Sequence, residues 1–280
     1  MKVTVITINY NNLHGLKRTI PSVLSQTYDD FEYIVVDGGS TDGSKEYIES
    51  QKGISQWVSE KDKGIYNAMN KGVSMAHGEY CIFMNSGDHF FSPYSLENAY
   101  KELDGTDYCV GRTVVIENSN SMLFMVPPTK MSLLFIKNNF LMHQSTFIKT
   151  SLLKEHPYDE ELKIISDWSH FFELWHNKKC TYKAMEYIIS VFYFDGISFA
   201  QRDIINEEKK LVINRILGDK ANLIIPRTQE EKREWITDRL KFKLESAMKK
   251  KPLSRDWKVI RNGVKFFFKD LFLYLRIIKK

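Results

Sequence analysis

Short apolar runs alternate with amphipathic stretches over residues 3–88. Val3–Ile8 and Phe31–Val36 are runs rich in β-branched and aromatic residues, which predict two buried strands. Helical spacing and polar turns predict three helices and two more strands in the same stretch: helices at 14–25, 45–51 and 63–76, and strands at 56–59 and 80–84. Strands that alternate with helices favour βαβ units, so we expect an α/β fold with a parallel sheet.

Pro21 lies inside the first predicted helix and is expected to kink or split it. After Asp88 the pattern of apolar and polar residues is less regular. From Asp203 the chain is predicted to be purely helical, and Thr228–Glu231 form a capping box that opens a helix reaching about Met248. We therefore expect an α/β domain over 1–202 and a helical extension over 203–280. Between Asp88 and Asp203 the expected elements are helices at 94–103, 131–136 and 167–177, and strands at 108–116 and 146–148.

Polar residues follow the ends of four predicted strands: Asn9, Asp37, Asp62 and the segment 85–88. In parallel α/β sheets, ligands bind beyond the carboxyl ends of the strands. These four clusters therefore define a candidate site at one edge of the sheet.

The loop 37–44, Asp-Gly-Gly-Ser-Thr-Asp-Gly-Ser, carries the strongest of these signals. A carboxylate that leaves a buried strand can accept hydrogen bonds from a nucleobase N–H or a ribose hydroxyl, and glycines let the backbone turn close to a ligand. The alternative is a turn in which Asp42 or Ser44 caps the next helix. The residues alone leave both interpretations of Asp37 open.

Two further segments suggest polar ligands. Asn67 and Asn70 lie three residues apart on one face of a predicted helix, where two amides suit recognition of a polar ligand; a solvated helix surface is the alternative. Asp88 follows a strand end, where a carboxylate can bind a hard divalent cation that neutralises a leaving diphosphate. A lone carboxylate in a turn is usually only a turn residue.

Composition adds a strongly basic end to an otherwise average globular chain. The net charge is +5, yet residues 249–280 hold eleven Lys and Arg and only two Asp, so the rest of the chain is mildly acidic. Cys81, Cys109 and Cys180 are widely spaced, which argues against a disulfide framework or a structural zinc site and suits a reducing cytoplasm. The N-terminal apolar run is too short for a signal peptide, and no run of about 20 apolar residues predicts a spanning helix.

In order and spacing these segments resemble family 2 glycosyltransferases, close to the branch found in bacterial polysaccharide and O-antigen gene clusters. The resemblance implies a GT-A fold, an α/β fold with a Rossmann-like mixed, mainly parallel sheet flanked by helices. It also implies an inverting enzyme that transfers a sugar from a nucleotide-sugar, commonly a UDP-sugar, to a saccharide acceptor. In relatives that acceptor is often carried on polyprenyl diphosphate. The resemblance runs from Val3 to about Ala200 and includes Thr7–Asn11, Ser22–Tyr28, the 37–44 loop, Asp62–Gly72 and Asn85–Asp88.

The resemblance also implies roles for individual residues. Asp88 would hold Mg²⁺ or Mn²⁺ against the diphosphate, and His143 is a second candidate ligand for metal or phosphate, a neutral core histidine being the alternative. Where many relatives carry Asp-x-Asp-Asp, this chain has Asn85 and Gly87 at the first two acidic places, so Asp88 is the only carboxylate of the motif. The nucleotide-sugar pocket would be lined by Thr7, Asn9, Tyr10, Asp37, Gly39, Asp62, Lys63, Asn67, Asn70, Asn85 and Ser86.

Asp167 stands where relatives carry an acidic general base. A sugar hydroxyl is a poor nucleophile, and a carboxylate within hydrogen-bond reach can take its proton as it attacks. The local alternative is an N-cap for the helix that follows. Leu141–Phe147 and Ile165–Trp168 also resemble family segments, and Phe194–Ser198 resembles a loop that closes over the donor in relatives, with an ordinary turn as the alternative.

Residues 257–280 predict a helix with a basic stripe on an apolar, aromatic body. Such a helix suits an anionic membrane surface, so we expect a cytoplasmic protein bound peripherally to the inner face of the plasma membrane. Docking onto the α/β domain, or burial in a homodimer, is the alternative.

Two other classes of function compete with glycosyl transfer. A nucleotidyltransferase would require a glycine-rich, basic phosphate loop after the first strand, and residues 7–12 contain none. A non-catalytic saccharide-binding or scaffold protein with the same fold gains some support from the acidic motif, which has lost two of its three carboxylates. Nucleic-acid binding is not expected, because the basic residues lie on an apolar helix rather than in a polar groove.

Overall fold

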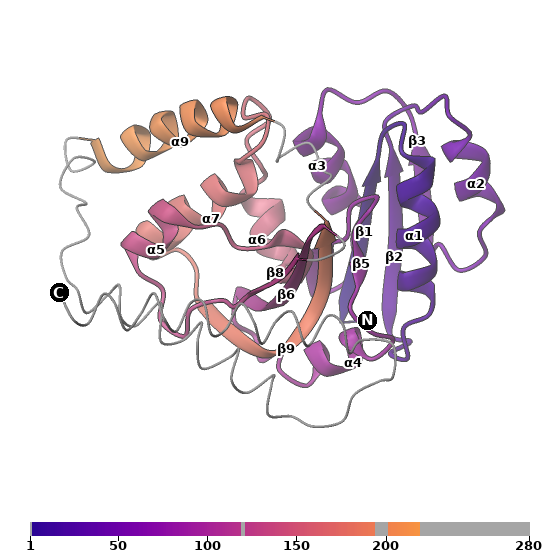
Figure 1. Ribbon diagram of the computed structural model, residues 1–280, viewed down its shortest axis with the longest axis horizontal. Coiled ribbons are helices and arrows are strands. Elements are labelled where there is room, and N and C mark those ends of the chain that lie inside the picture. The colour runs from indigo at the N-terminus through magenta and orange to yellow at the C-terminus, as the bar shows by residue number, and fades with distance from the viewer. Residues whose placement is uncertain (1, 119–120, 194–200, 219–280) are drawn as a thin grey trace.

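The computed structural model describes residues 2–118, 121–193 and 201–218 (Figure 1). Three predictions fall outside these residues: the loop at 194–198, the capping box at 228–231 and the basic helix at 257–280. They stay predictions. So does most of the helical extension predicted over 203–280.

One mixed sheet runs through the described part of the molecule (Figure 1). Its strand order is β3-β2-β1-β4-β8-β6-β9-β5, with β7 paired to β6 beside this path. The first four strands in that order are parallel, whereas β8 runs antiparallel to both of its neighbours. The strands are β1 (Val3–Asn9), β2 (Phe31–Asp37), β3 (Gln56–Ser59), β4 (Tyr80–Phe83), β5 (His89–Phe90), β6 (Tyr108–Asn118), β7 (Ser121–Met125), β8 (Thr146–Lys149) and β9 (Tyr182–Tyr193).

Helices cover both faces of this sheet. On one face lie α1 (Leu13–Leu24), α2 (Ser44–Ser50) and α4 (Ser95–Tyr100), whose buried residues share one core cluster. The other face of the sheet carries α3 (Ile65–Met75), α5 (Leu133–Asn138), α6 (Thr150–Glu155), α7 (Ser166–His176) and α9 (Arg202–Leu217).

None of the helices in the described part of the chain is long and apolar enough to cross a membrane.

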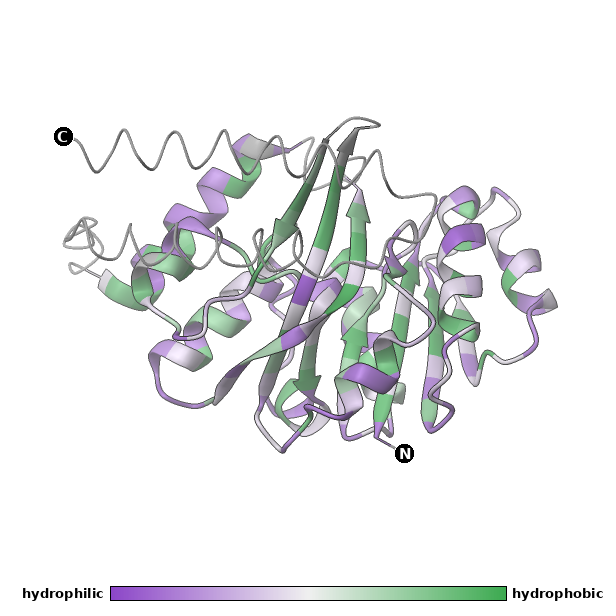
Figure 2. Ribbon diagram, turned by 60° about the horizontal axis from the view of Figure 1, so that its bottom comes forward, coloured by the Kyte–Doolittle hydropathy of each residue, from purple (hydrophilic) through white to green (hydrophobic). Residues whose placement is uncertain are grey.

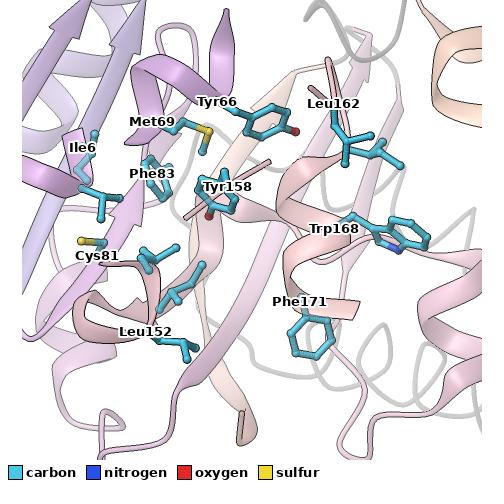
Figure 3. Close-up of a cluster of buried hydrophobic side chains, with 14 of the residues drawn as sticks. Ile6, Tyr66, Met69, Cys81, Phe83, Leu152, Tyr158, Leu162, Trp168 and Phe171 are labelled. Carbon is cyan, nitrogen blue, oxygen red and sulfur yellow. The ribbon is translucent and has the colours of Figure 1, made fainter. Parts of the chain in front are cut away.

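Alternation along β1 explains how one strand serves both faces. Val3 and Val5 belong to the cluster under α1, whereas Ile6 and Ile8 belong to the cluster under α3. Successive side chains of a strand point to opposite faces, so a strand covered on both sides must be apolar almost throughout. Figure 2 shows this as hydrophobic colour along the strands, and Figure 3 shows Ile6 packed with Met69 of α3 and Phe83 of β4.

The predicted elements of residues 3–88 are present, and their ends agree with the prediction to within two residues. The helix α1 continues through Pro21 instead of being split there. The prediction missed the long strand β9, whose first half is partly exposed and carries Lys183 and Glu186, so that no clear alternation marks it. The short elements β5, β7 and α6 were missed as well.

Helix α9 packs against α7 and the loop before it. Its Glu208 carboxylate accepts hydrogen bonds from the backbone N–H groups of Lys163 (2.6 Å) and Ile164 (3.1 Å). Arg215 donates to Asp159 (2.9 Å) and to the hydroxyl of Ser169 (2.9 Å). The described part of the predicted extension thus supports the α/β domain directly.

A buried carboxylate ties the opposite, amino-terminal ends of the strands together. Glu32 accepts hydrogen bonds from the Thr4 hydroxyl, the Gln56 amide and both the backbone and the ring of His77, each at 2.9 Å. Burial alone would raise the pKa of Glu32, but the hydrogen bonds from His77, Thr4 and Gln56 outweigh it, so the pKa lies below its ordinary value.

Replacing Glu32 by Gln is expected to lower the free energy of unfolding at neutral pH by about 1–3 kcal/mol, because donors that face a carboxylate would meet a neutral amide. The folded-state pKa is the lower one, so the carboxylate's stabilisation is complete above the unfolded pKa and is lost as pH falls through the folded pKa. The free energies of unfolding of the two proteins, measured by urea denaturation, should therefore converge in acid. A difference that stays constant with pH would contradict this, and Glu49→Gln, at an exposed position, is the control.

Candidate active site

The candidate site begins where the parallel strands end. Asn9, Asp37 and Ser59 are register partners at the carboxyl ends of β1, β2 and β3. The segment after β4 stays beside β1, since the N–H groups of Met84 and Ser86 donate to the Ile6 and Ile8 carbonyls (2.8 and 3.1 Å). The structure therefore brings the predicted polar clusters to one edge of the sheet.

Asp37 is fully buried, and the protein itself satisfies its carboxylate. Oδ1 accepts from the Asn9 amide (2.7 Å) and the Ser40 hydroxyl (2.5 Å), while Oδ2 accepts from the Ser40 N–H (3.0 Å) and the Ser59 hydroxyl (2.7 Å). Although burial opposes ionisation, these bonds from Ser40, Ser59 and Asn9 hold its pKa below the ordinary value. Asp37 is thus a charged anchor for the loop, and a direct contact with a nucleotide requires a serine hydroxyl to turn away.

Tyr10 and Asp62 lie on either side of Gly38. A Cβ at Gly38 would stand 2.3 Å from Asp62 Oδ2 and 3.2 Å from the Tyr10 ring, so only glycine allows both side chains to approach this closely. The Tyr10 ring is 66% exposed, and Gly39 turns with φ +79° against the backbone of Lys61. An exposed ring beside a partly exposed carboxylate gives this edge a stacking surface and a hydrogen-bond acceptor.

The prediction for Thr7 is wrong in this arrangement. Its side chain is fully buried on the face that packs against α1, where its hydroxyl is bonded to the Met84 carbonyl (2.7 Å) and the Tyr33 hydroxyl (3.0 Å). Because residues alternate along β1, Thr7 points into the core while Asn9, two positions on, reaches the strand end. Thr7 joins β1, β2 and β4 and does not line a pocket.

The amides of Asn67 and Asn70, for which a donor-binding role is predicted, form hydrogen bonds within the protein. Asn70 accepts from the Tyr158 N–H and donates to the Tyr158 carbonyl and to Glu160 (3.0, 3.0 and 2.9 Å). Asn67 donates to the other oxygen of Glu160 (2.9 Å) and accepts from the N–H of Lys63 (3.2 Å), whose side chain is exposed. The two asparagines hold the segment 158–160 against α3.

The turn 85–88 is fixed by α1 and by a glycine in the left-handed region. Gly87 has φ +110°, a conformation that an aspartate at this place of the acidic motif would adopt only with strain. Its N–H donates to the Thr19 hydroxyl (2.9 Å), which in turn donates to the Asp88 carbonyl (2.6 Å). Ser86 accepts from the Asn12 amide through its carbonyl (3.0 Å). The turn presents Asp88, only 8% exposed, at the site.

His143 lies between the two carboxylates that the sequence marked as metal ligand and base. Its Nδ1 is 3.4 Å from Asp167 Oδ2, and its Nε2 is 3.9 Å from Asp88 Oδ2 and 3.1 Å from the Asn85 amide nitrogen. Burial alone would lower the pKa of His143, but Asp167 and then Asp88 outweigh it, and the pKa is raised. A histidine that gives one N–H to a carboxylate and turns its other nitrogen toward a second carboxylate resembles a metal ligand with its supporting acid.

Asp167 lies in the first turn of α7, and the helix N-cap is Ile165, so the capping alternative is wrong. Its Oδ1 accepts from the hydroxyl of Tyr66 (3.0 Å), a residue of α3. With Tyr66 on one oxygen and His143 facing the other, the carboxylate is held from two sides. Sequence reasoning missed Tyr66, although it stands inside the 62–72 segment, because nothing local indicates its partner 101 residues away.

A divalent cation would find few ligands in the protein itself. Across the described residues, no group of three or more His, Cys, Asp or Glu side chains could hold a metal ion. Asp88, His143 and the Asn85 amide oxygen, which is buried without a hydrogen-bond partner among the described residues, nevertheless converge at the turn. Mg²⁺ commonly binds through one or two carboxylates, with substrate phosphates and water completing its shell, so these residues fit a cation that arrives with a diphosphate.

Comparison with solved structures confirms the fold class. The S. aureus TarS structure with UDP-GlcNAc aligns at a TM-score of 0.59 and 19% identity, covering 87% of this chain and 81% of that one. A mannosyltransferase from Pyrobaculum calidifontis, in complex with GDP-Man and Mn²⁺, aligns at a TM-score of 0.57 and 16% identity, covering 76% and 63%. These likenesses, together with the sheet order, show the GT-A fold.

Comparison with curated sequences finds glycosyltransferases. An uncharacterized glycosyltransferase of Mycobacterium tuberculosis is 33% identical over 175 residues, which are 59% of this chain and 65% of the relative, just under two thirds of its length. A PGL/p-HBAD biosynthesis glycosyltransferase of Mycobacterium bovis is 26% identical over 226 residues, covering 76% of this chain and 84% of the relative. The family model "Glycosyl transferase family 2" matches residues 4–155. Since that match spans more than half of the chain, the protein belongs to glycosyl transferase family 2.

Proposed function

We propose that this protein is an inverting glycosyltransferase that moves a sugar from a nucleotide-sugar to a saccharide acceptor. The observation that carries the proposal is the convergence of Asp88, His143 and Asp167 beside the strand ends that hold Asp37. It supplies a place for a diphosphate with its cation and, next to it, a carboxylate base. Family membership agrees with this chemistry.

The donor is proposed to be a UDP-sugar. TarS, which shares the fold, is solved with UDP and with UDP-GlcNAc, whereas the archaeal mannosyltransferase is solved with GDP-Man, so GDP and dTDP donors are the alternatives to test. In this chain the Tyr10 ring and the Asp62 carboxylate beside Gly38 suit stacking on a base and acceptance from its N–H groups or from a ribose hydroxyl.

The proposed reaction is a single displacement. The acceptor hydroxyl oxygen attacks the anomeric carbon, the bond from that carbon to the diphosphate oxygen breaks, and the bonding electrons leave with the nucleoside diphosphate. Asp167 takes the hydroxyl proton, so no other acid or base is required for balance. Attack from the face opposite the leaving group inverts the anomeric centre.

Mg²⁺ or Mn²⁺ is proposed to bind at Asp88, with His143 and the Asn85 amide oxygen as further candidates. The cation would neutralise the charge that develops on the leaving diphosphate. With one carboxylate in the motif, metal affinity in the absence of nucleotide is expected to be modest. His143 can serve this site only if its Nε2 is unprotonated, so a cation has to displace the proton that the raised pKa of His143 favours. In the neutral ring, the contact of Nδ1 with Asp167 selects the tautomer whose Nε2 is free.

The acceptor is proposed to be a lipid-linked saccharide in bacterial surface polysaccharide biosynthesis, such as that of O-antigen or capsule. The similarity to a mycobacterial glycosyltransferase named for PGL/p-HBAD biosynthesis agrees with a biosynthetic role. The basic, apolar segment 257–280 supports a protein bound to the cytoplasmic membrane surface, where such acceptors lie. Burial of this segment in a homodimer is the competing proposal.

The first experiment is a screen of UDP-, GDP- and dTDP-sugars for binding and for release of nucleoside diphosphate, with and without Mn²⁺. Release from one donor, stimulated by a saccharide acceptor, is the expected result. Binding of saccharide without release from any donor would favour the alternative, a non-catalytic saccharide-binding or scaffold protein, which the thinned acidic motif suggests.

Asp88→Ala is expected to weaken metal-dependent donor binding about 10- to 100-fold, because the only motif carboxylate is lost. Isothermal titration of donor at fixed Mn²⁺ measures this, and donor binding without metal should change little. Asp29→Ala, the same change at an exposed position between α1 and β2, is the matched control. An unchanged titration would remove Asp88 from the metal site.

Asp167→Asn is expected to keep donor affinity within about twofold and to reduce transfer by about 100-fold or more, the usual contribution of a general base. Donor titration and a transfer assay together separate the two effects. Full turnover would exclude Asp167 as the base. A loss of metal-dependent donor affinity would instead show that Asp167 acts through His143 on the cation.

Removal of 257–280 is expected to abolish binding to vesicles that contain anionic lipid, since each basic residue near such a surface contributes on the order of 1 kcal/mol. Co-sedimentation with anionic and neutral vesicles measures it. The matched variant replaces Lys258, Arg261, Lys265 and Lys269 by Gln and keeps the apolar face. Undiminished sedimentation of the truncated protein would contradict the membrane proposal.

A further inference from the structure

Asp167 receives a hydrogen bond from a residue that no sequence motif links to it. The Tyr66 hydroxyl lies 3.0 Å from Asp167 Oδ1 and 2.5 Å from the carbonyl oxygen of Ile164, so its one proton is shared between the carboxylate and the backbone just before α7. Figure 3 shows the ring reaching from α3 toward the side of Leu162. The Tyr66 ring is 4% exposed and packs against Tyr158 with centroids 5.6 Å apart.

The hydroxyl keeps its proton and can act toward this carboxylate only as a donor. Burial, followed by the charge of Asp167, raises the pKa of Tyr66 well above its ordinary value, so it stays protonated in any assay near neutral pH. A carboxylate oxygen has two acceptor positions, and the bond from Tyr66 uses one of them. The other position remains for the proton of an acceptor hydroxyl.

Tyr66 also connects the donor edge to the base. It stands in the first turn of α3, four residues after Asp62, whose carboxylate touches Gly38 in the loop after β2. On the same helix, Asn67 directly after Tyr66 and Asn70 one turn further along hold the segment 158–160, which leads to Asp167. The segment 62–72 thus spans the site, with the donor loop at one end and the base at the other.

We infer that Tyr66 is a positioning residue that orients the carboxylate of Asp167 toward the acceptor hydroxyl. This inference rests on the proposed role of Asp167 as the base. The orientation of a carboxylate matters because proton transfer needs a short, aligned contact, and a misplacement of about 1 Å can cost about 100-fold in rate. It also assigns the 62–72 segment a part in holding the base, in addition to its contact with the donor loop.

The test is Tyr66→Phe, which removes one hydroxyl and keeps the ring. The turnover number for transfer is expected to fall about 10- to 100-fold, while donor affinity and the Michaelis constant for donor stay within about twofold. Tyr158→Phe is the matched control, because its hydroxyl is buried in the same ring cluster and has no hydrogen-bond partner among the described residues. That variant should transfer sugar at the wild-type rate.

A double variant separates positioning from a general effect on folding. If Tyr66 acts through Asp167, Tyr66→Phe should slow the residual turnover of Asp167→Asn no further, whereas an independent structural role would multiply the two losses. Wild-type turnover of Tyr66→Phe, or an equal loss in Tyr158→Phe, would overturn the inference. Failure of the proposed base role has a different signature, since Asp167→Asn would then retain full transfer, and failure of the proposed function would show as no release of nucleoside diphosphate by the wild-type protein from any donor.

Discussion

The parallel register of β1, β2 and β3 is the constraint on which the candidate site depends. It places Asn9, Asp37 and Ser59 side by side, and their short bonds keep a buried carboxylate ionised where the chain leaves the sheet. An unpaired buried charge would be costly, so this arrangement forms only when all three strands end together. The loop that carries Gly38 and Gly39 takes its conformation from that anchor. Strand β4 continues the same edge of the sheet, and Asp88 lies in the turn that follows it.

Asp167, the proposed base, belongs to a different part of the fold and is held by contacts across the chain. Asp167 lies in the first turn of α7, and the loop before this helix lies between α3 and α9. Tyr66 bonds Ile164 from one side, and Glu208 of α9 accepts from the Ile164 N–H on the other. Lys209 adds a cation–π contact to Trp168, with its nitrogen 5.2 Å from the ring centre. Helix α9 therefore contributes to the geometry of the site although it lies beyond the residues that match the family model.

The departure from the Asp-x-Asp-Asp pattern has a local physical explanation. Gly87 occupies a left-handed turn that a side chain would strain, and Asn85 directs its amide to His143. The turn therefore lacks two carboxylates of the pattern and keeps Asp88, which lies beside His143. A cation bound there would take most of its ligands from the substrate, which would tie metal binding to donor binding.

The sequence by itself determined the order of strands and helices in residues 3–88 and the polar loops at strand ends, because apolar periodicity and turn residues act over a few positions. It also marked Asp37, Asp88 and Asp167 as chemically special. It did not show that Thr7 faces the core, since a strand buried on both sides has no polar face to reveal its orientation. Only the tertiary structure decided the partners of Asn70 and Tyr66, which lie 90 and 101 residues away and leave no local signal. The strand β9, half-exposed and irregular in pattern, became definable only when β6 paired with it.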